Sequence, residues 1–385
     1  MNDSRKCSHL CVSLEVKINV VSMSTRENRT TLLNGQLWTM LKVGLIALGA
    51  SLIYVCFFYH SEDKWHVDTS TVNLGREFRV MPFYKDLETL PDNDSVAVDK
   101  LIRVYGNFWE EYSEAILKIG PFNDPNTVRE LRRFLTDASI LETQAAIDTT
   151  SGSAERINKI SLELEDGFKR FHHLMPNEPV PDIILMNSAF HWAVFPREDY
   201  VAIGLDLFLG HEHSVTLKLA PEVFPQYQKL RMHPDLITAN TLKGWMQVHF
   251  TNRGYNGQML IEDMLYHGKV LWLADKCLPE FHDHLLMEWT PEDLVWASAN
   301  EGNLWLELQP QDVLFETNRN IYNRWLNQGP FTRAGAVPQS SPDRLGIWMG
   351  WQMVEDYMNL NSDISIDELF DELDPTPFLK AYRPG

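Results

Sequence analysis

The sequence predicts a mostly helical α+β fold in which helices pack around a small antiparallel β-sheet. Apolar residues recur at the three- and four-residue spacing of helices before residue 174 and again after residue 235. Between these stretches, short apolar segments of strand length are separated by turn residues. With 385 residues, of which 44% are hydrophobic, the chain has enough apolar material for one large domain or two ordinary ones.

The net charge of −19 restricts the class of partner that the protein can bind. Most of the acidic residues follow residue 60, so the body of the protein is acidic. An acidic surface repels phosphate backbones, and a nucleic-acid partner is therefore not expected.

An uncharged apolar stretch near the N-terminus predicts a signal or membrane anchor within residues 40–59. No charged residue occurs from 43 to 59, which is the lower limit of length for a transmembrane helix. Basic residues precede the stretch and acidic residues follow it, a pattern that predicts a cytoplasmic N-terminus and a body outside the inner membrane. Residues 1–39 are polar and mixed, and we expect them to be poorly structured.

Cys56 lies near the end of this stretch, where a lipoprotein carries its lipidated cysteine. Lipid attachment normally needs a small residue immediately before the cysteine, and Val55 precedes it here. The sequence therefore leaves open both lipidation of Cys56 and an unprocessed transmembrane anchor. Cys277 has no cysteine partner in the body, so no disulfide is expected there.

Residues 60–97 are predicted to be a linker with one possible strand, and residues 98–385 to be a single exported α+β domain. Helical spacing occurs over 98–120 and 155–173, and Asp124-Pro125 predicts the start of another helix between them.

The β signal comes next. A continuous apolar run at 183–186 is followed by strand-like segments at 190–195 and 200–205. Between the last two, Pro196 to Asp199 is typical of a hairpin turn, which favours a three-stranded antiparallel arrangement.

Helices return in the last part of the chain. The spacing predicts a helix over 235–250, and Thr290-Pro291 begins another that extends to residue 308. Ser341-Pro342 predicts the start of a helix containing Gly346 and Gly350, whose spacing allows a second helix to approach closely. A capping box at Ser365 precedes a short closing helix.

The segment 258–279 predicts the helix around which the chain is organised. Its apolar residues form one stripe, and Glu262 and Lys269 lie two turns apart beside that stripe. Asp263 and His267 form an i, i+4 pair, which we expect to favour the imidazolium form. Gly268 indicates that another backbone packs closely. The pattern fits an ordinary buried helix or the wall of a polar pocket.

Motifs for the common catalytic sites are absent from the sequence, including H-E-x-x-H, a P-loop, a serine nucleophile elbow and a glycine-rich dinucleotide turn. The histidine pairs at 172–173, 211–213 and 282–284 each come without an obvious third ligand, so solvated or capping roles are expected. No cofactor is therefore expected.

Several motifs in a fixed order resemble the GldB family, the envelope lipoproteins of gliding bacteria. They are GLDLFLG, IEDMLYHGKVLWLADKCLP, WASANEGNLW, SSPDRLGIWMGWQMVEDYM and DELFDELDPTPFLKAYRP, and the resemblance covers roughly 64–384. It implies a membrane-attached periplasmic protein required for gliding motility and linked to type IX secretion. The implied partners are envelope proteins of the gliding and secretion machinery, together with the membrane through the N-terminal anchor.

The family also resembles, more distantly, the zincin-like peptidases. Where those carry H-E-x-x-H, this chain retains only His249, with Glu262 on the following helix. The resemblance therefore implies a zincin-like fold without the metal motif, whose former cleft binds a partner. We expect that cleft to be lined by Glu262, His267, Lys269, Asn300, Glu301 and Arg344.

Two other functions remain open. One is a metal-dependent hydrolase that uses an unconventional ligand set such as His249, Glu262 and His267. The other is glycan or peptidoglycan binding through exposed tryptophans, although most of the 12 tryptophans are expected in the core.

Overall fold

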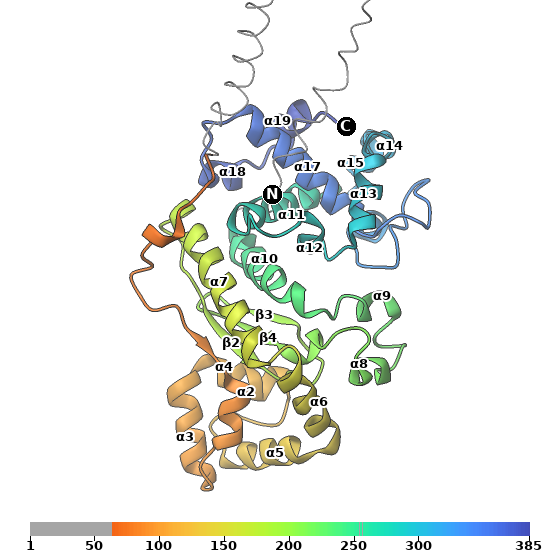
Figure 1. Ribbon diagram of the computed structural model, residues 1–385. Coiled ribbons are helices and arrows are strands. Elements are labelled where there is room, and N and C mark those ends of the chain that lie inside the picture. Colours follow the sequence, from red (N-terminus) through yellow and green to blue (C-terminus); the bar gives the residue numbers. More distant parts are fainter. Residues whose placement is uncertain (1–63, 254, 256) are drawn as a thin grey trace, which may run out of the picture. The chain divides into compact units, whose positions relative to one another are not determined.

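The fold is built on a four-stranded sheet with the order β1-β2-β4-β3 (Figure 1). The computed structural model describes residues 64–253, 255 and 257–385. β2 pairs in parallel with both β1 and β4, whereas β3 and β4 form an antiparallel hairpin. The strands are β1 (Val80–Met81), β2 (Asp182–Met186), β3 (Val194–Pro196) and β4 (Tyr200–Gly204).

The sheet is mixed, and the prediction of an antiparallel sheet is therefore wrong for two of its three strand pairs. The predicted hairpin is confirmed, because β3 and β4 flank the turn after Pro196. β2 and β4 run in parallel because the chain returns through β3 at the sheet edge before it enters β4. Every residue of β2 and of β4 is buried, which is the continuous apolar pattern typical of parallel strands.

The predicted N-terminal extension (1–39), the predicted anchor (40–59) and Cys56 lie outside the described residues. Trp65–Gly385 form one compact unit. Residues 65–97, within the predicted linker, are part of this unit, since β1 lies in the sheet and Phe83 is fully buried. Among the described helices, none combines the length and the apolarity that a bilayer span requires.

The helices of the first part of the body follow their local signals. Asp124 caps α5, and Ser153 caps α7, in agreement with the predicted helices there. The predicted helix over 98–120 is divided at Gly106, whose φ of +49° ends α3 before α4 begins at Asn107. The sequence pattern does not predict α6. These helices are α2 (Phe83–Asp86), α3 (Asp94–Tyr105), α4 (Asn107–Glu111), α5 (Pro125–Thr136), α6 (Ala138–Thr149) and α7 (Ala154–Leu174).

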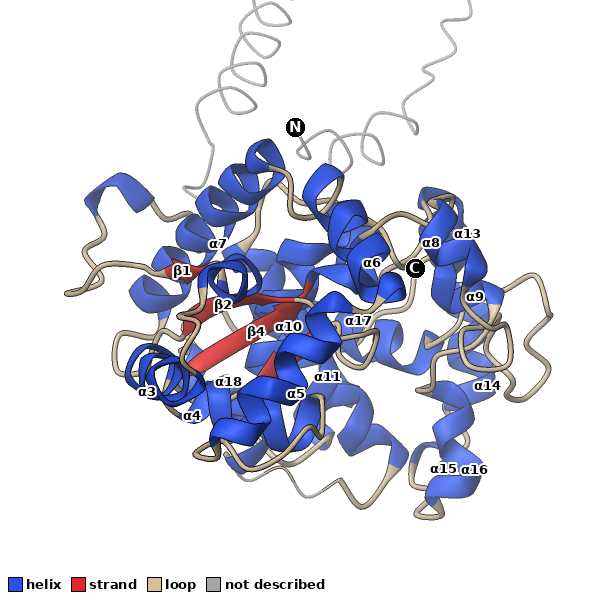
Figure 2. Ribbon diagram, turned by 90° about the horizontal axis from the view of Figure 1, so that it is seen from below, coloured by secondary structure: helices blue, strands red, loops and turns tan. Residues whose placement is uncertain are grey.

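The two sheet faces contribute to different cores, because successive strand residues point to opposite sides. Ile183 and Leu185 join the larger core with α7 and the helices that follow the sheet. Ile184 and Met186 join a smaller core with α2 to α5. Figure 2 shows helices on both sides of the strands.

The helices after the sheet carry the site. Capping boxes at Thr290 and Ser365 begin α13 and α18 as predicted. The helix predicted to reach residue 308 instead divides at Asn300 into α13 and α14. These helices are α8 (Ser214–Lys218), α9 (Gln226–Lys229), α10 (Ile237–His249), α11 (Leu260–Cys277), α12 (Asp283–Leu286), α13 (Pro291–Ala299), α14 (Glu301–Leu308), α15 (Gln311–Leu314), α16 (Arg319–Tyr322), α17 (Leu345–Leu360), α18 (Ile366–Asp371) and α19 (Thr376–Ala381).

α11 and α17 lie side by side, and glycines set their separation (Figure 1). A Cβ atom at Gly268 would lie 2.4 Å from the carbonyl carbon of Gly350, and one at Gly350 would lie 1.9 Å from the carbonyl oxygen of Met264. Real atoms do not approach this closely, so no larger residue fits at either position without separating the helices. The close approach predicted from Gly268 is confirmed.

Candidate functional site

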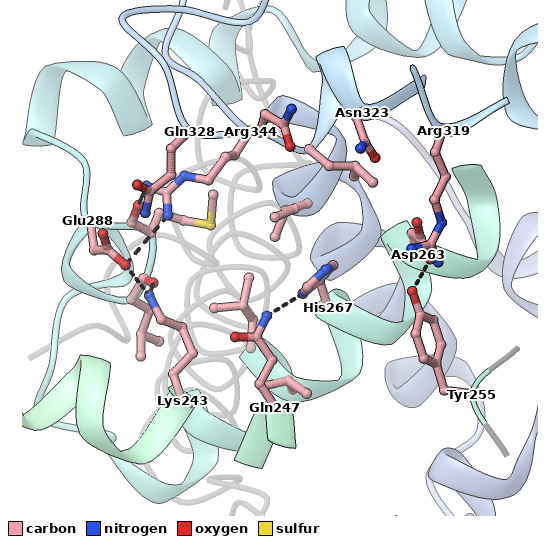
Figure 3. A pocket seen from close by; sticks show the side chains of 17 residues that line it. Lys243, Gln247, Tyr255, Asp263, His267, Glu288, Arg319, Asn323, Gln328 and Arg344 are labelled. Carbon is pink, nitrogen blue, oxygen red and sulfur yellow. Dashed lines mark hydrogen bonds and ion pairs between the residues drawn. The ribbon is translucent and has the colours of Figure 1, made fainter. Parts of the chain in front are cut away.

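α11 is a buried helix and also the wall between two pockets. The larger one, which we call the charged pocket, has a volume of about 440 Å³ (Figure 3). The one on the other side, which we call the small pocket, holds about 40 Å³. The charged pocket is lined by Lys243, Gln247, Tyr255, Asp263, His267, Val270, Leu271, Leu286, Met287, Glu288, Arg319, Asn323, Leu326, Asn327, Gln328, Arg344 and Ile347.

One wall of the charged pocket is made by buried ion pairs between α10, the segment after α12, and the start of α17 (Figure 3). Glu288 accepts a hydrogen bond of 2.7 Å from Lys243 Nζ and lies 3.5 Å from Arg344 Nη1. The Lys243 and Glu288 side chains are only 14% and 10% exposed. Lys243 also donates to the carbonyl of Leu286 at 2.8 Å.

Two further residues extend these contacts behind the wall. Asp343, whose side chain is fully buried, accepts hydrogen bonds from Arg231 Nη2 at 2.6 Å and from Arg344 Nε at 3.2 Å. Arg231 Nε also lies 4.0 Å from Glu288. We call Arg231, Lys243, Glu288, Asp343 and Arg344 the ion cluster. It joins three positive charges to two negative ones.

The ion cluster alters the ionisation of its own members. Burial alone would raise the pKa of Glu288, but the surrounding cations outweigh burial and hold that pKa at about 2. The pKa of Lys243 is lowered, first by burial and then by the two neighbouring guanidinium groups, although Glu288 opposes that shift. Glu288 is therefore a fixed negative charge at neutral pH.

Backbone strain accompanies the ion cluster. Glu288 and Arg344 have φ angles of +53° and +55°, a left-handed conformation that residues other than glycine rarely adopt. Such conformations cost on the order of 1–3 kcal/mol each and are found preferentially at functional sites. Glu288 and Arg344 are also ion-pair partners, 3.5 Å apart. Their strained backbone therefore lowers the stability of the fold while it places these two charges beside the pocket.

The opposite wall is formed by Asp263 and His267 of α11 together with Gln247 and Tyr255, which hydrogen-bond to them. Gln247 Nε2 donates to His267 Nδ1 at 2.6 Å, and the hydroxyl of Tyr255 donates to Asp263. Burial lowers the pKa of His267 to about 4, against the opposing charge of Asp263. The prediction that the Asp263–His267 pair favours imidazolium is therefore wrong. Desolvation of the buried His267 ring outweighs the attraction of the Asp263 carboxylate, which accepts a hydrogen bond from Tyr255.

The small pocket contains two of the predicted cleft residues, Glu262 and Lys269. Glu262 accepts a hydrogen bond from the backbone of Gln258 at 2.8 Å. Lys269 donates to the carbonyl of Glu372 at 2.6 Å, and burial lowers its pKa to about 8. At about 40 Å³ this pocket has room for little more than ordered water.

Asn300 and Glu301 line neither of the two pockets. The side chain of Asn300 donates to the carbonyl of Trp296 at 2.8 Å, and Glu301 accepts from the hydroxyl of Tyr382 at 2.8 Å. Asn300 therefore closes the end of α13, and Glu301 links the start of α14 to the C-terminal segment. Of the predicted cleft residues, the charged pocket brings together His267 and Arg344.

Sequence reasoning missed Lys243, Gln247 and Glu288. Lys243 carried a usable signal, because it is the one lysine of α10, among largely buried neighbours, and a buried lysine needs a partner. Glu288 carried none, since it lies in an irregular segment 45 residues further along the chain.

The ligand set suggested for a metal-dependent hydrolase is not assembled. His249 pairs with Glu178 at 2.7 Å and stacks on Trp245, His267 lines the charged pocket, and Glu262 lines the small one. Within the described part of the chain, no three histidine, cysteine or acidic side chains are placed to hold a metal ion.

The family described as gliding motility protein GldB matches residues 62–384, close to the range covered by the predicted resemblance. No curated protein and no solved structure matches the chain, so the zincin-like relationship stays a prediction. Because the match extends over the whole described body, the chain belongs to the gliding motility protein GldB family.

Proposed function

We propose that this protein is a membrane-anchored, non-catalytic component of the cell envelope that supports gliding motility by binding a partner in the charged pocket. Its body would lie in the periplasm, held by the segment at 40–59 through lipidation of Cys56 or a transmembrane helix. A link to type IX secretion is part of the proposal and rests on the family resemblance.

The observation that carries the binding role is the construction of the charged pocket. Its volume of about 440 Å³ lies within the usual range for ligand sites, and both polar and apolar side chains line it. Its charged groups are held in place by ion pairs and hydrogen bonds within the protein, so they are preorganised before a ligand arrives. Preorganised charges beside apolar surface favour recognition of a partner.

Complementation of a deletion strain tests this proposal. Gln328 is exposed, lines the charged pocket and is not a member of the ion cluster, so Gln328→Trp would obstruct the pocket while keeping all five charges. Glu198→Trp, on an exposed residue of the β3–β4 turn away from the pocket, is the matched control. We expect wild type and Glu198→Trp to restore colony spreading and protein secretion, and Gln328→Trp to restore neither at equal protein level.

Two outcomes would contradict the proposal. Full gliding with Gln328→Trp would remove the charged pocket from the function. A deletion strain that glides and secretes normally would remove the cellular role itself.

A further inference from the structure

The ion cluster has an unequal number of charges. Arg231, Lys243 and Arg344 are the basic residues, and Glu288 and Asp343 are the carboxylates that face them. With Lys243 protonated against Glu288 at 2.7 Å, the cluster carries one excess positive charge. An excess positive charge in a buried position is costly unless a counter-ion reaches it. The excess is notable because the whole chain carries a net charge of −19.

The cluster also retains hydrogen-bond donors. Lys243 uses two of its three N–H groups on Leu286 and Glu288. Among the described residues, the buried Arg231 Nη1 has no hydrogen-bond partner. Lys243 and Arg344 line the charged pocket, so a ligand there meets the side of the cluster that carries the excess charge.

The remaining surface of the charged pocket defines the rest of a ligand. Apolar side chains from α11, the segment around α12, the segment after α16, and α17 line the pocket beside the charges, together with several amide side chains. The apolar residues are Val270, Leu271, Leu286, Met287, Leu326 and Ile347. Such a surface fits an apolar group attached to the anion, not a bare ion.

We propose that the charged pocket binds a carboxylate that carries an apolar group, with the carboxylate placed against Lys243 and Arg344. This inference rests on the proposed partner-binding function and names the chemistry of the bound group. A single negative charge balances the single excess positive charge, whereas a phosphate dianion would place two charges near Glu288 and Asp263. The carboxylate belongs either to a protein or to a small molecule.

Ligands that differ only in charge test the proposal directly. The full-length, detergent-extracted protein is titrated with N-acetylleucine, with its uncharged amide, N-acetylleucinamide, and with inorganic phosphate, and the melting temperature is recorded. We expect saturable stabilisation by N-acetylleucine and none by the other two. Equal effects of the acid and the amide, or stabilisation by phosphate alone, would overturn the proposal, as would the absence of any effect.

Variants locate the effect. Lys243→Gln removes the excess charge and should weaken N-acetylleucine binding about tenfold or more, as expected for loss of a charged hydrogen bond. Lys380→Gln, on an exposed lysine of α19 outside the charged pocket, should bind as wild type does. Undiminished binding by Lys243→Gln would overturn the proposal, and the comparison of acid with amide on wild type remains decisive if that variant does not fold.

Photo-cross-linking in cells separates this inference from the proposed function and identifies the source of the carboxylate. A photoreactive residue at Gln328 should give a protein adduct that excess N-acetylleucine suppresses when the source is a protein. When the source is a small molecule, an amphipathic acid should be recovered from the purified protein. An adduct that N-acetylleucine does not suppress would contradict the inference and leave the partner-binding function standing.

Discussion

Glu288 and Asp206 are both buried carboxylates, and the protein treats them in opposite ways. Glu288 faces three cations, which hold its pKa at about 2. Asp206, at the end of β4, is reached by the backbone N–H groups of Ser188 and Phe190 and by the Ser188 hydroxyl, all of them neutral donors. Burial raises its pKa despite those hydrogen bonds.

The comparison shows that burial does not by itself decide the charge of a group. Beside the charged pocket, the fold keeps a carboxylate ionised by surrounding it with cations. Beneath the loop after β2, the fold uses a carboxyl group mainly as a hydrogen-bond acceptor that holds two strand ends together. The first arrangement places charged groups at the wall of the charged pocket, and the second joins the ends of β2 and β4.

The largest expected effect comes from Glu288→Gln. This change leaves Lys243 and Arg344 buried without their shared carboxylate, and removal of one partner from a buried ion pair typically costs about 3–5 kcal/mol. The free energy of unfolding of the full-length protein, measured by denaturant titration at pH 7, should fall by this amount. A loss below about 1 kcal/mol would mean that the ion cluster contributes little net stability.

The pH dependence sharpens the same difference. Because the folded pKa of Glu288 lies below its usual value of 4.5, its contribution is fully present above pH 4.5 and is lost as the pH falls towards 2. The span of about 2.5 pH units corresponds to roughly 3 kcal/mol. Unfolding free energies of wild type and Glu288→Gln should therefore converge over this interval. Parallel curves would show that Glu288 is not held ionised by its neighbours.

Asp206→Asn should have a smaller effect. The amide keeps one acceptor oxygen but turns an NH₂ group towards one backbone donor, which costs about 1–2 kcal/mol. No buried charge pair is broken, so the free energy of unfolding at pH 7 should fall less than for Glu288→Gln. A loss as large as that of Glu288→Gln would show that an ionised Asp206 is essential and that the contrast between the two carboxylates is false.

Local signals in the sequence predict the helices of this fold well. The starts of α5, α13 and α18 depend on a capping residue and its immediate neighbours, so they can be read from a few adjacent residues. The glycine contact between α11 and α17 was also predictable, because a glycine inside a helix is unfavourable without a packing reason.

Features that depend on distant parts of the chain could not be predicted in the same way. The direction of β2 relative to β4 depends on the path between them, which the residues of either strand do not encode. The Lys243–Glu288 pair joins residues 45 positions apart. The start of α17 at Leu345, later than its capping signal at Ser341, follows from the use of Asp343 and Arg344 in the ion cluster. The charged pocket could therefore be predicted only through isolated members such as Arg344.

The position of α11 has a mechanical consequence. This helix has the charged pocket on one flank and the small pocket on the other, while the glycine contact with α17 fixes its third side. A sideways displacement of α11 towards one cavity would shrink that cavity and enlarge the other, and the tight backbone contact resists any such displacement. The helix is therefore held in place between the two pockets, and the size of both pockets depends on the close contact at Gly268 and Gly350.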